Sequence, residues 1–307
     1  MILITGAGGF IGQYLRVRLM DIGLHVMPLY HAAKLQVFDE HWACDLTCPE
    51  HLAELKNAVK VPKTIIHLAG HVEIVLRANS HAQDAHPLPG KENISKIYDL
   101  NVSATANLLD FCLSTNVRHL IFASSQSVYG MPQSCPLTEE TYCKPLEHYA
   151  MSKLCCEQLL RIGAQQGLMV TIMRLPGVFS EARWSGVVFK FCQQAIRSGK
   201  IHVRADYPLP LDVIHLEDIV DAFIKTVSWG GQEGCTCFNI ATAEPCSLNL
   251  LAETIASLVP GCQVEHSKIS QPIVQMCSKR AEILLGWKAR PQRYRLATML
   301  SSMNHAC

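Results

Sequence analysis

The chain has 307 residues, of which 49% are hydrophobic, and a formal net charge of +1 at pH 7. This length allows a full hydrophobic core in one large domain or in two, and the composition is typical of an ordered globular protein. No run approaches the roughly 18 apolar residues of a membrane helix, and Met1 leads into a strand-like run without the basic segment of a signal peptide. Basic clusters are also absent, which argues against nucleic acid as a partner.

The cysteine content would suggest disulfides only in a small secreted chain. The 14 cysteines form no C-x-x-C pair, and no histidine pair lies nearby at zinc-binding spacing. We therefore expect free thiols that pack as small apolar side chains. The sequence predicts a cytoplasmic protein without a bound metal.

Apolar strand-like runs alternate with helical patterns over the first 175 residues. The expected strands are 2–5, 24–30, 41–44, 63–69, 119–125 and 168–175, and the expected helices are 10–22, 101–116 and 148–166. Continuously apolar strands that alternate with helices predict an α/β fold with a parallel sheet covered on both faces, a Rossmann-like doubly wound arrangement. Residues 78–98 form the longest irregular stretch, which is typical of a lid or a binding loop.

The pattern changes after residue 176. Helices are expected at 187–199, 216–229, 247–259 and 280–287, with short strands at 201–205 and 237–241. These shorter, mixed elements predict a smaller α/β region built onto the sheet. We therefore divide the chain into a Rossmann domain at 1–175, completed by segments near 210–241, and a mainly substrate-binding region at 176–307.

The first strand and the first helix are joined by a glycine-rich turn, TGAGGFIG at residues 5–12. Gly6 permits the turn, Gly9 allows the backbone to approach a diphosphate, and Gly12 allows the helix to pack closely on the strand. The free N–H groups and the positive dipole end of the helix then face the phosphates. The sequence therefore predicts a dinucleotide site, which also includes Phe10 and Ile11.

The end of the second strand leaves the choice between NAD and NADP open. An NAD site usually has an acidic side chain there for the ribose hydroxyls, but this chain has Tyr30 and His31, followed by Lys34. No carboxylate would repel a 2′-phosphate, yet no arginine is present to attract one. Asp45 and Leu46, after the third strand, are expected beside the adenine.

A tyrosine and a lysine are spaced by four residues in the helix at 148–166. This spacing places Tyr149 and Lys153 on one face, and a neighbouring ammonium is expected to lower the pKa of the phenol and make it a usable acid or base. Serines of the stretch 124–130 follow the fifth strand at the carboxyl edge of the sheet, where doubly wound folds bind ligands. A serine hydroxyl there can hold a substrate oxygen while the tyrosine moves a proton.

The motifs together resemble those of the extended short-chain dehydrogenase/reductase family, the NAD-dependent epimerase/dehydratases. The resemblance covers nearly the whole chain. The matching motifs are TGAGGFIG (5–12), DL (45–46), HLAG (67–70), Asn101 within NVSATANLLDFC, SSQSVYG (124–130), YAMSK (149–153), DVIHLED (212–218) and LLGW (284–287).

The resemblance implies a role for several residues. Tyr149 is the implied acid/base, Lys153 its partner and a ribose ligand, and Ser125 the assisting hydroxyl, with Ser127 as a second candidate. Further cofactor-binding positions are Leu68, Ala69, Gly70, Asn101, Pro176 and Val178. Substrate-binding positions are His71, Ser125, Gln126, Ser127, Tyr149 and Gly177. The resemblance also implies a homodimer formed by the helices at 101–116 and 148–166.

Departures from the family pattern narrow the function. The dehydratases have Asp-Glu after the catalytic hydroxyl, where this chain has Gln126 and Ser127. Leu211 occupies the usual place of a diphosphate-binding arginine, and Gly177 replaces an asparagine. Arg174, at the end of a strand, is interpreted as structural. Either other basic residues hold the diphosphate (Arg183, Lys190 and Arg204 are available) or the substrate has none.

Three functions follow from these observations. The leading hypothesis is an epimerase or 4-keto reductase of a nucleotide-activated sugar, and not a 4,6-dehydratase, that uses NAD or NADP and a Ser-Tyr-Lys site. The alternative is a reductase or dehydrogenase of a smaller carbonyl or alcohol, favoured by the missing diphosphate contacts. A dinucleotide-binding protein without catalysis is the third, and the intact Ser-Tyr-Lys set argues against it.

Overall fold

The computed structural model describes residues 1–58, 60–72, 93–131, 134–204 and 210–305. Contacts between residues divide the chain into two compact units. The first unit consists of Met1–Val128, Pro145–Met173 and Gly230–Thr236, and the second consists of Tyr129–Lys144, Arg174–Trp229 and Cys237–Cys307. Each unit is therefore assembled from separate segments of the sequence.

An eight-stranded sheet organises the fold, with the order β11-β7-β6-β5-β1-β2-β4-β3. Its strands are β1 (Ile2–Thr5), β2 (Val26–His31), β3 (Gln36–Val37), β4 (Trp42–Cys44), β5 (Thr64–His67), β6 (His119–Ser125), β7 (Met169–Leu175) and β11 (Cys235–Asn239). β1 pairs in parallel with both β2 and β5, and β3 is an antiparallel edge strand. The sheet thus extends from β1 on both sides, toward β2 on one side and toward β5 on the other. Such a switch point in the strand order is where doubly wound sheets bind ligands.

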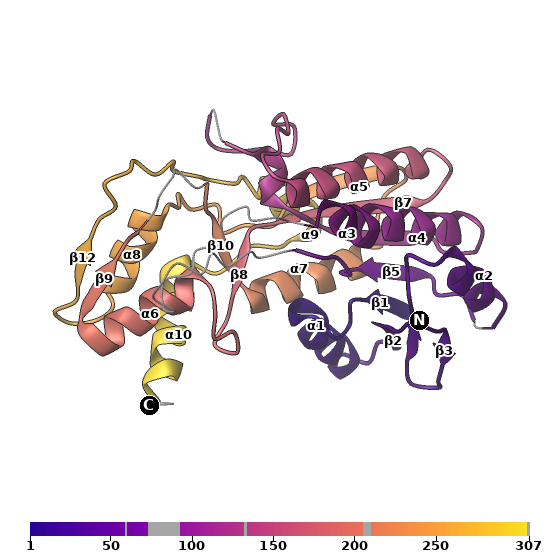
Figure 1. The fold of residues 1–307 in the computed structure, drawn as a ribbon, viewed down its shortest axis with the longest axis horizontal. Coiled ribbons are helices and arrows are strands. Elements are labelled where there is room, and N and C mark those ends of the chain that lie inside the picture. The colour runs from indigo at the N-terminus through magenta and orange to yellow at the C-terminus, as the bar shows by residue number, and fades with distance from the viewer. Residues whose placement is uncertain (59, 73–92, 132–133, 205–209, 306–307) are drawn as a thin grey trace. The chain divides into compact units, whose positions relative to one another are not determined.

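Helices cover both faces of this sheet. α1 (Phe10–Asp21) packs against β1 and β2, while α2 (Pro49–Ala58) contacts α4 (Ala104–Leu113), which in turn contacts α5 (His148–Ala164). Figure 1 shows α4 and α5 side by side, with α3 (Ile94–Tyr98) next to them. A single π-helical turn, Asp99–Ser103, joins α3 to α4. The predicted Rossmann-like doubly wound sheet is confirmed.

The observed elements confirm some expected bounds and correct one. β1, β6 and α7 (Leu216–Trp229) begin and end where the sequence pattern placed them. The expected irregular stretch 78–98 is wrong at its end, because Ile94–Tyr98 is helical and Asn93 caps this helix by accepting a hydrogen bond from the Lys96 amide. The rest of that stretch, up to residue 92, lies outside the described residues.

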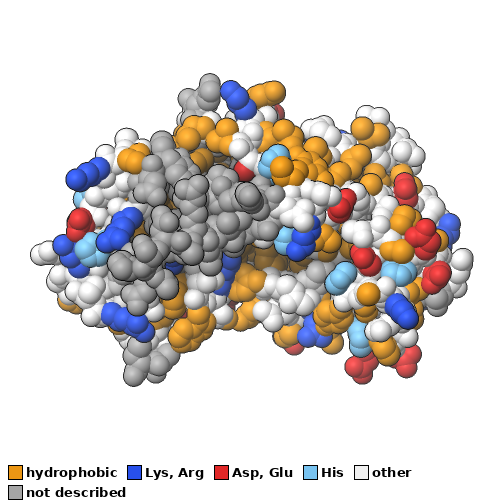
Figure 2. All heavy atoms as spheres, viewed as in Figure 1, with side chains coloured by type: hydrophobic (Ala, Val, Ile, Leu, Met, Phe, Trp, Pro, Cys, Tyr) orange, Lys and Arg blue, Asp and Glu red, His pale blue; other side chains and the backbone are white. Residues whose placement is uncertain are grey.

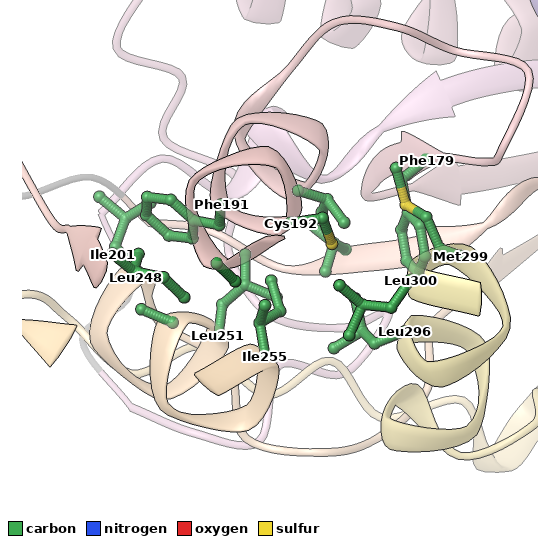
Figure 3. Packing of buried hydrophobic residues seen from close by; sticks show 14 of the residues in the cluster. Phe179, Phe191, Cys192, Ile201, Leu248, Leu251, Ile255, Leu296, Met299 and Leu300 are labelled. Carbon is green, nitrogen blue, oxygen red and sulfur yellow. The ribbon is translucent and has the colours of Figure 1, made fainter. Parts of the chain in front are cut away.

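The second unit has its own hydrophobic core. It contains α6 (Val187–Ser198), α7, α8 (Leu248–Ala256), α9 (Lys279–Leu285) and α10 (Gln292–His305), with two short parallel strand pairs: β8 (Gly177–Phe179) with β10 (Val213–His215), and β9 (Lys200–His202) with β12 (Gln263–Glu265). In Figure 3, side chains of α6, α8 and α10 point toward one another. The labelled members are Phe179, Phe191, Cys192, Ile201, Leu248, Leu251, Ile255, Leu296, Met299 and Leu300.

A buried ion pair joins α10 to the start of α7. The Arg295 guanidinium donates to the Asp218 carboxylate through Nε at 2.9 Å and through Nη2 at 2.7 Å, and to Glu217 at 2.5 Å. Arg295 and Asp218 are both buried, and removing one partner of such a pair leaves an uncompensated charge that costs about 3–5 kcal/mol. The Trp287 indole N–H also donates to the Asp218 carbonyl, at 3.0 Å.

Within the described ranges, no helix combines the length and the apolarity that crossing a membrane requires. Figure 2 shows basic and acidic side chains dispersed over the coloured part of this face. Every cysteine in the described part of the chain is a free thiol.

Candidate active site

The turn after β1 has the geometry that its glycines predict. Gly6 has a φ of +67°, and a Cβ there would lie 2.7 Å from the Ala69 amide nitrogen. A Cβ on Gly12 would lie 2.3 Å from the Gly6 carbonyl oxygen, so only glycine lets α1 pack this closely on the turn. Gly9 is the N-cap of α1 and has no capping side chain. The first backbone N–H groups of α1 are therefore available to an anion.

A cavity of about 250 Å³ opens beside this turn within the first unit. It brings together residues that the sequence analysis placed in the cofactor site from four separate segments of the chain. The lining residues are Gly6, Leu29, Tyr30, His31, Cys44, Asp45, Leu46, Thr47, Ala69, Gly70, His71, Leu100 and Ala104. Tyr30 and His31 end β2, and the Tyr30 ring would lie 3.5 Å from a Cβ added to Gly8.

Asp45 is the carboxylate of this cavity. Its Oδ1 accepts hydrogen bonds from the Thr47 amide at 2.9 Å and from the Thr47 hydroxyl at 2.8 Å. Burial opposes ionisation of Asp45, but the Thr47 hydrogen bonds and the nearby His31 and His51 outweigh it and lower its pKa. Asp45 is therefore ionised at neutral pH and is held in one orientation.

Tyr149, Lys153 and Ser125 converge at the carboxyl end of β6. The Ser125 side chain lies close enough to the Tyr149 phenol to favour its ionisation, and the Ser125 Oγ accepts from the Ser127 hydroxyl at 2.9 Å. The buried Lys153 donates from Nζ to the Ala123 carbonyl at 2.9 Å, and Nζ lies 6.0 Å from the centroid of the Tyr149 ring. The three predicted side chains thus share one site.

The electrostatics of the pair differ from the expectation. Burial raises the pKa of Tyr149 to about 12, although the Ser125 side chain acts to lower it. Burial also lowers the pKa of Lys153. The predicted lowering of the Tyr149 pKa by Lys153 is therefore wrong for this structure, because desolvation of the phenolate outweighs the attraction of an ammonium that lies several ångströms from the ring.

Asn101 braces the site from the π-helical turn. Its Oδ1 accepts from the His71 amide at 2.6 Å, and its Nδ2 donates to the His71 carbonyl at 3.0 Å and to the Ser152 Oγ at 2.8 Å. Both side-chain N–H groups are thus used within the protein. The Asn101 amide therefore holds the backbone around the site, and its predicted contact with the cofactor stays a prediction.

Several features of the site fit a bound dinucleotide and substrate. A Cβ on Gly70 would lie 3.2 Å from the Lys153 Nζ and 3.3 Å from the Asn101 Oδ1, so glycine keeps this space open. Among the described residues, the His71 Nε2 and the Gln126 Oε1 are buried polar atoms without a hydrogen-bond partner. Such atoms are costly unless a ligand or water satisfies them.

Three predicted positions lie in the second unit. Pro176, Gly177 and Val178 lead into or form β8, where the Gly177 amide donates to the Asp212 carbonyl at 3.0 Å. Their contacts with cofactor or substrate stay a prediction. Arg174 is structural, as predicted: it is buried, stacks over the Tyr129 ring, and donates to the Tyr129 hydroxyl at 2.9 Å.

Sequence reasoning missed the residues that support the site. Thr5, Thr47, Thr105 and Ser152 make the hydrogen bonds that orient its functional groups. Thr5 and Ser152 lie inside the motifs TGAGGFIG and YAMSK, so their presence in these motifs was the available signal.

Comparisons with known proteins place this site in a family. The model of the NAD dependent epimerase/dehydratase family matches residues 2–241. The bifunctional UDP-glucose 4-epimerase and UDP-xylose 4-epimerase 3 of Arabidopsis thaliana is 24% identical, over 94% of this chain and 91% of its own length. The dTDP-4-dehydro-6-deoxyglucose reductase of Escherichia coli is 27% identical, over 94% of this chain and 92% of its own length.

Solved structures show the same fold. MoeE5, in complex with UDP-glucuronic acid and NAD, superposes with a TM-score of 0.76 at 24% identity, covering 100% of this chain and 99% of its own. The UDP-glucose 4-epimerase of Thermotoga maritima, with UDP-glucose, has a TM-score of 0.77 at 19% identity, covering 99% of each chain. Because the family model matches most of its length, the chain belongs to the NAD dependent epimerase/dehydratase family.

Proposed function

We propose that this protein is an NAD(P)-dependent epimerase or 4-keto reductase of a nucleotide-activated sugar. The observation that carries the proposal is the convergence of Ser125, Tyr149 and Lys153 near Gly70, which also lines the cavity beside the glycine turn. The relatives named as UDP-glucose 4-epimerases and as a dTDP-4-keto sugar reductase support this substrate class.

The dinucleotide would bind across the switch point of the sheet. The N-terminus of α1 and the glycine turn would hold the diphosphate, Asp45 and the end of β2 would hold the adenosine, and Lys153 would contact the nicotinamide ribose. When bound, the nicotinamide supplies hydride transfer to or from the sugar carbon. The chain fits this group because glycine keeps the turn and the space beside Lys153 open.

The protein's own groups would manage the proton. The Ser125 hydroxyl would hold the substrate oxygen by a hydrogen bond, and Tyr149 would exchange a proton with that oxygen. With a pKa of about 12, Tyr149 carries its proton at neutral pH. This state suits donation to a carbonyl oxygen, so the direction that requires Tyr149 to accept a proton is expected to accelerate as the pH rises.

Dehydration is not part of this proposal. One structural neighbour, TunA, is an NDP-hexosamine 5,6-dehydratase, with 21% identity and a TM-score of 0.73. At the positions after Ser125, however, this chain has Gln126 and Ser127, which cannot act as the acid and base of a water elimination.

The protein is further proposed to be a cytoplasmic homodimer. The free thiols of the described cysteines suit a reducing compartment. The outward side of α5 supports a dimer: Met151 is 40% exposed, Ile162 is 59% exposed, and Cys155 lies between them at helical spacing. An apolar stripe of this kind on a surface helix is typical of an interaction face.

The direct test replaces the phenol. Tyr149→Phe is expected to lower kcat by roughly 10²–10⁴-fold while NADH binding persists, because only the proton-transferring hydroxyl is removed. Turnover is followed by NMR with UDP-, GDP- and dTDP-sugars, each with NAD or NADP. Tyr142→Phe is the control, since Tyr142 is 84% exposed in the second unit. Absence of turnover by the unmodified protein with every sugar would refute the proposal.

A further inference from the structure

A buried line of hydrogen bonds runs from the glycine turn to Asn101. The Ala69 amide donates to the Thr5 hydroxyl at 3.2 Å, and this hydroxyl lies 2.6 Å from the His67 Nδ1. On the other side of the ring, the His67 Nε2 lies 3.1 Å from the Thr105 hydroxyl, which donates to the Asn101 carbonyl at 2.6 Å. Thr5, His67, Thr105 and Asn101 are all buried, so water does not replace these bonds.

The Asn101 carbonyl at one end of this line and the Ala69 amide at the other determine which group donates in each hydrogen bond. A carbonyl oxygen cannot donate, so the single proton of the Thr105 hydroxyl points to Asn101, and Thr105 can only accept from the His67 Nε2. His67 therefore carries its proton on Nε2. Its Nδ1 must then accept, and the Thr5 hydroxyl donates to it while accepting from Ala69.

The surroundings of His67 favour this neutral form. Burial, and the charge of Lys153, lower the pKa of His67 to about 3. The Phe122 ring lies 5.6 Å from the imidazole and 4.7 Å from the Lys153 Nζ, and so faces both. The Cys156 thiol also lies against this line: it donates to the Asn101 carbonyl at 3.4 Å, and burial raises its pKa.

The line ends on the groups that shape the active site. Thr5 directly precedes Gly6 of the turn, while Asn101 holds both backbone groups of His71 and the Ser152 hydroxyl. Ser152 in turn donates to the Tyr149 carbonyl at 2.7 Å. A continuous set of hydrogen bonds thus connects the turn beside the cavity with the first turn of α5.

We propose that His67, fixed as the neutral Nε2–H tautomer, is a positioning residue that sets the glycine turn and the Tyr149 segment in register. Two sites must be held at a fixed separation for hydride and proton transfer, and small misplacement is expensive in rate. His67 is suited to this task because a neutral imidazole accepts at one end and donates at the other. The catalytic part of this inference rests on the proposed function, whereas the tautomer and its effect on dinucleotide binding do not.

The first test observes the tautomer directly. In protein labelled with ¹⁵N at histidine, His67 is expected to show a protonated Nε2 and an unprotonated Nδ1, unchanged from about pH 5 to about pH 9. His67→Gln assigns the signal by its loss. A protonated Nδ1, or a titration of His67 within this range, would overturn the proposal.

The second test compares two buried histidines of the same unit. His67 is the last residue of β5, whereas His119 is the first residue of β6. His119 is also buried and shares a hydrogen bond of 2.8 Å with the Thr171 hydroxyl. We expect His67→Leu to weaken NADH and NADPH binding, measured by fluorescence titration, and to lower kcat, each by about tenfold. His119→Leu is expected to leave both within about twofold of the unmodified protein, whatever its effect on thermal stability.

The conservative variant separates positioning from bulk stability. Glutamine retains a donor and an acceptor on one side chain, so His67→Gln is expected to recover most of the dinucleotide affinity that His67→Leu loses. Equal losses in His119→Leu, or unaltered affinity in His67→Leu, would contradict the proposal. If the unmodified protein turns over no sugar nucleotide, the proposed function fails while the tautomer and the dinucleotide affinities still decide this inference.

Discussion

At the scale of single residues, the end of β2 is expected to influence which dinucleotide the cavity accepts. Tyr30 and His31 line the cavity where an NAD-selective site has a carboxylate for the ribose hydroxyls. Asp45 lies in the same cavity but is held by Thr47 through two hydrogen bonds. We therefore expect the residues at the end of β2 not to discriminate against a 2′-phosphate.

An introduced carboxylate is expected to create that discrimination. Tyr30→Asp should favour NADH over NADPH by about tenfold relative to the unmodified protein, because the new charge accepts from ribose hydroxyls and repels a 2′-phosphate. Paired fluorescence titrations with the two reduced dinucleotides measure the ratio. Tyr30→Asn, which adds a side chain of similar size without charge, is the control, and an unchanged ratio in Tyr30→Asp would show that another part of the cavity selects the cofactor.

The residue scale also shows where sequence reasoning succeeds and where it stops. The tight geometry at Gly6 and Gly12 and the proximity of Tyr149 and Lys153 were predictable because each depends on local spacing along the chain. The raised pKa of Tyr149 was not, since burial depends on contacts that no i,i+4 spacing reveals. The bracing role of Asn101 was likewise hidden, because its partners His71 and Ser152 are distant in sequence.

At the scale of secondary-structure elements, Asp212 is expected to make the second unit sensitive to pH. Asp212 immediately precedes β10 and is fully buried, with only Oδ1 accepting from the Val213 amide at 2.7 Å. Burial, aided by the charge of Glu244, raises its pKa from the usual 3.8 to about 7. The folded state thus binds a proton that the unfolded state releases, and stability falls as the pH rises from about 4 to about 7.

Removing this ionisation should flatten the pH dependence. The cost of the buried carboxylate above pH 7 is of the order of 4 kcal/mol, so Asp212→Asn is expected to gain thermal stability relative to the unmodified protein on going from pH 5 to pH 8. Circular dichroism melts at both pH values provide the comparison. Glu282→Gln, an exposed change on α9, should leave the difference in melting temperature between the two pH values unchanged. The same difference in the unmodified protein and in Asp212→Asn would refute the assignment.

Elements were predictable where hydrophobic pattern alone determines them. β1 and β6 are continuously buried strands, and α7 has a strong apolar face, so their bounds follow from the sequence. β3, β8, β10 and β12 were missed because each has only two or three residues and is defined by its pairing partner. α10 was missed because polar and charged side chains, Arg295 among them, interrupt its apolar pattern.

At the scale of the whole molecule, the exposed stripe on α5 bears on assembly. Met151 and Ile162 are exposed, and the half-buried Cys155 lies between them at helical spacing. Burying such a stripe against a second copy would remove apolar surface from water, which contributes about 25 cal/mol per Å². The dimer proposed above therefore depends on the apolar character of this face.

A charge in the stripe is expected to dissociate the dimer. Ile162→Glu should shift the protein from dimer to monomer at micromolar concentration, because two carboxylates would be buried across a symmetric contact. Multi-angle light scattering measures the mass, and NADH titration confirms that the monomer is folded. Glu54→Lys, an exposed charge change on α2, is the control. If the unmodified protein is monomeric, the dimer proposal is wrong.

The attachment of α10 has a consequence for biosynthesis. Leu296, Met299 and Leu300 complete the core of the second unit, and Arg295 neutralises Asp218. These residues are translated after all other described elements, so the nascent second unit holds an unpaired acidic side chain and an open apolar groove until α10 leaves the ribosome. Premature termination before Arg295 is therefore expected to give a polypeptide that chaperones retain.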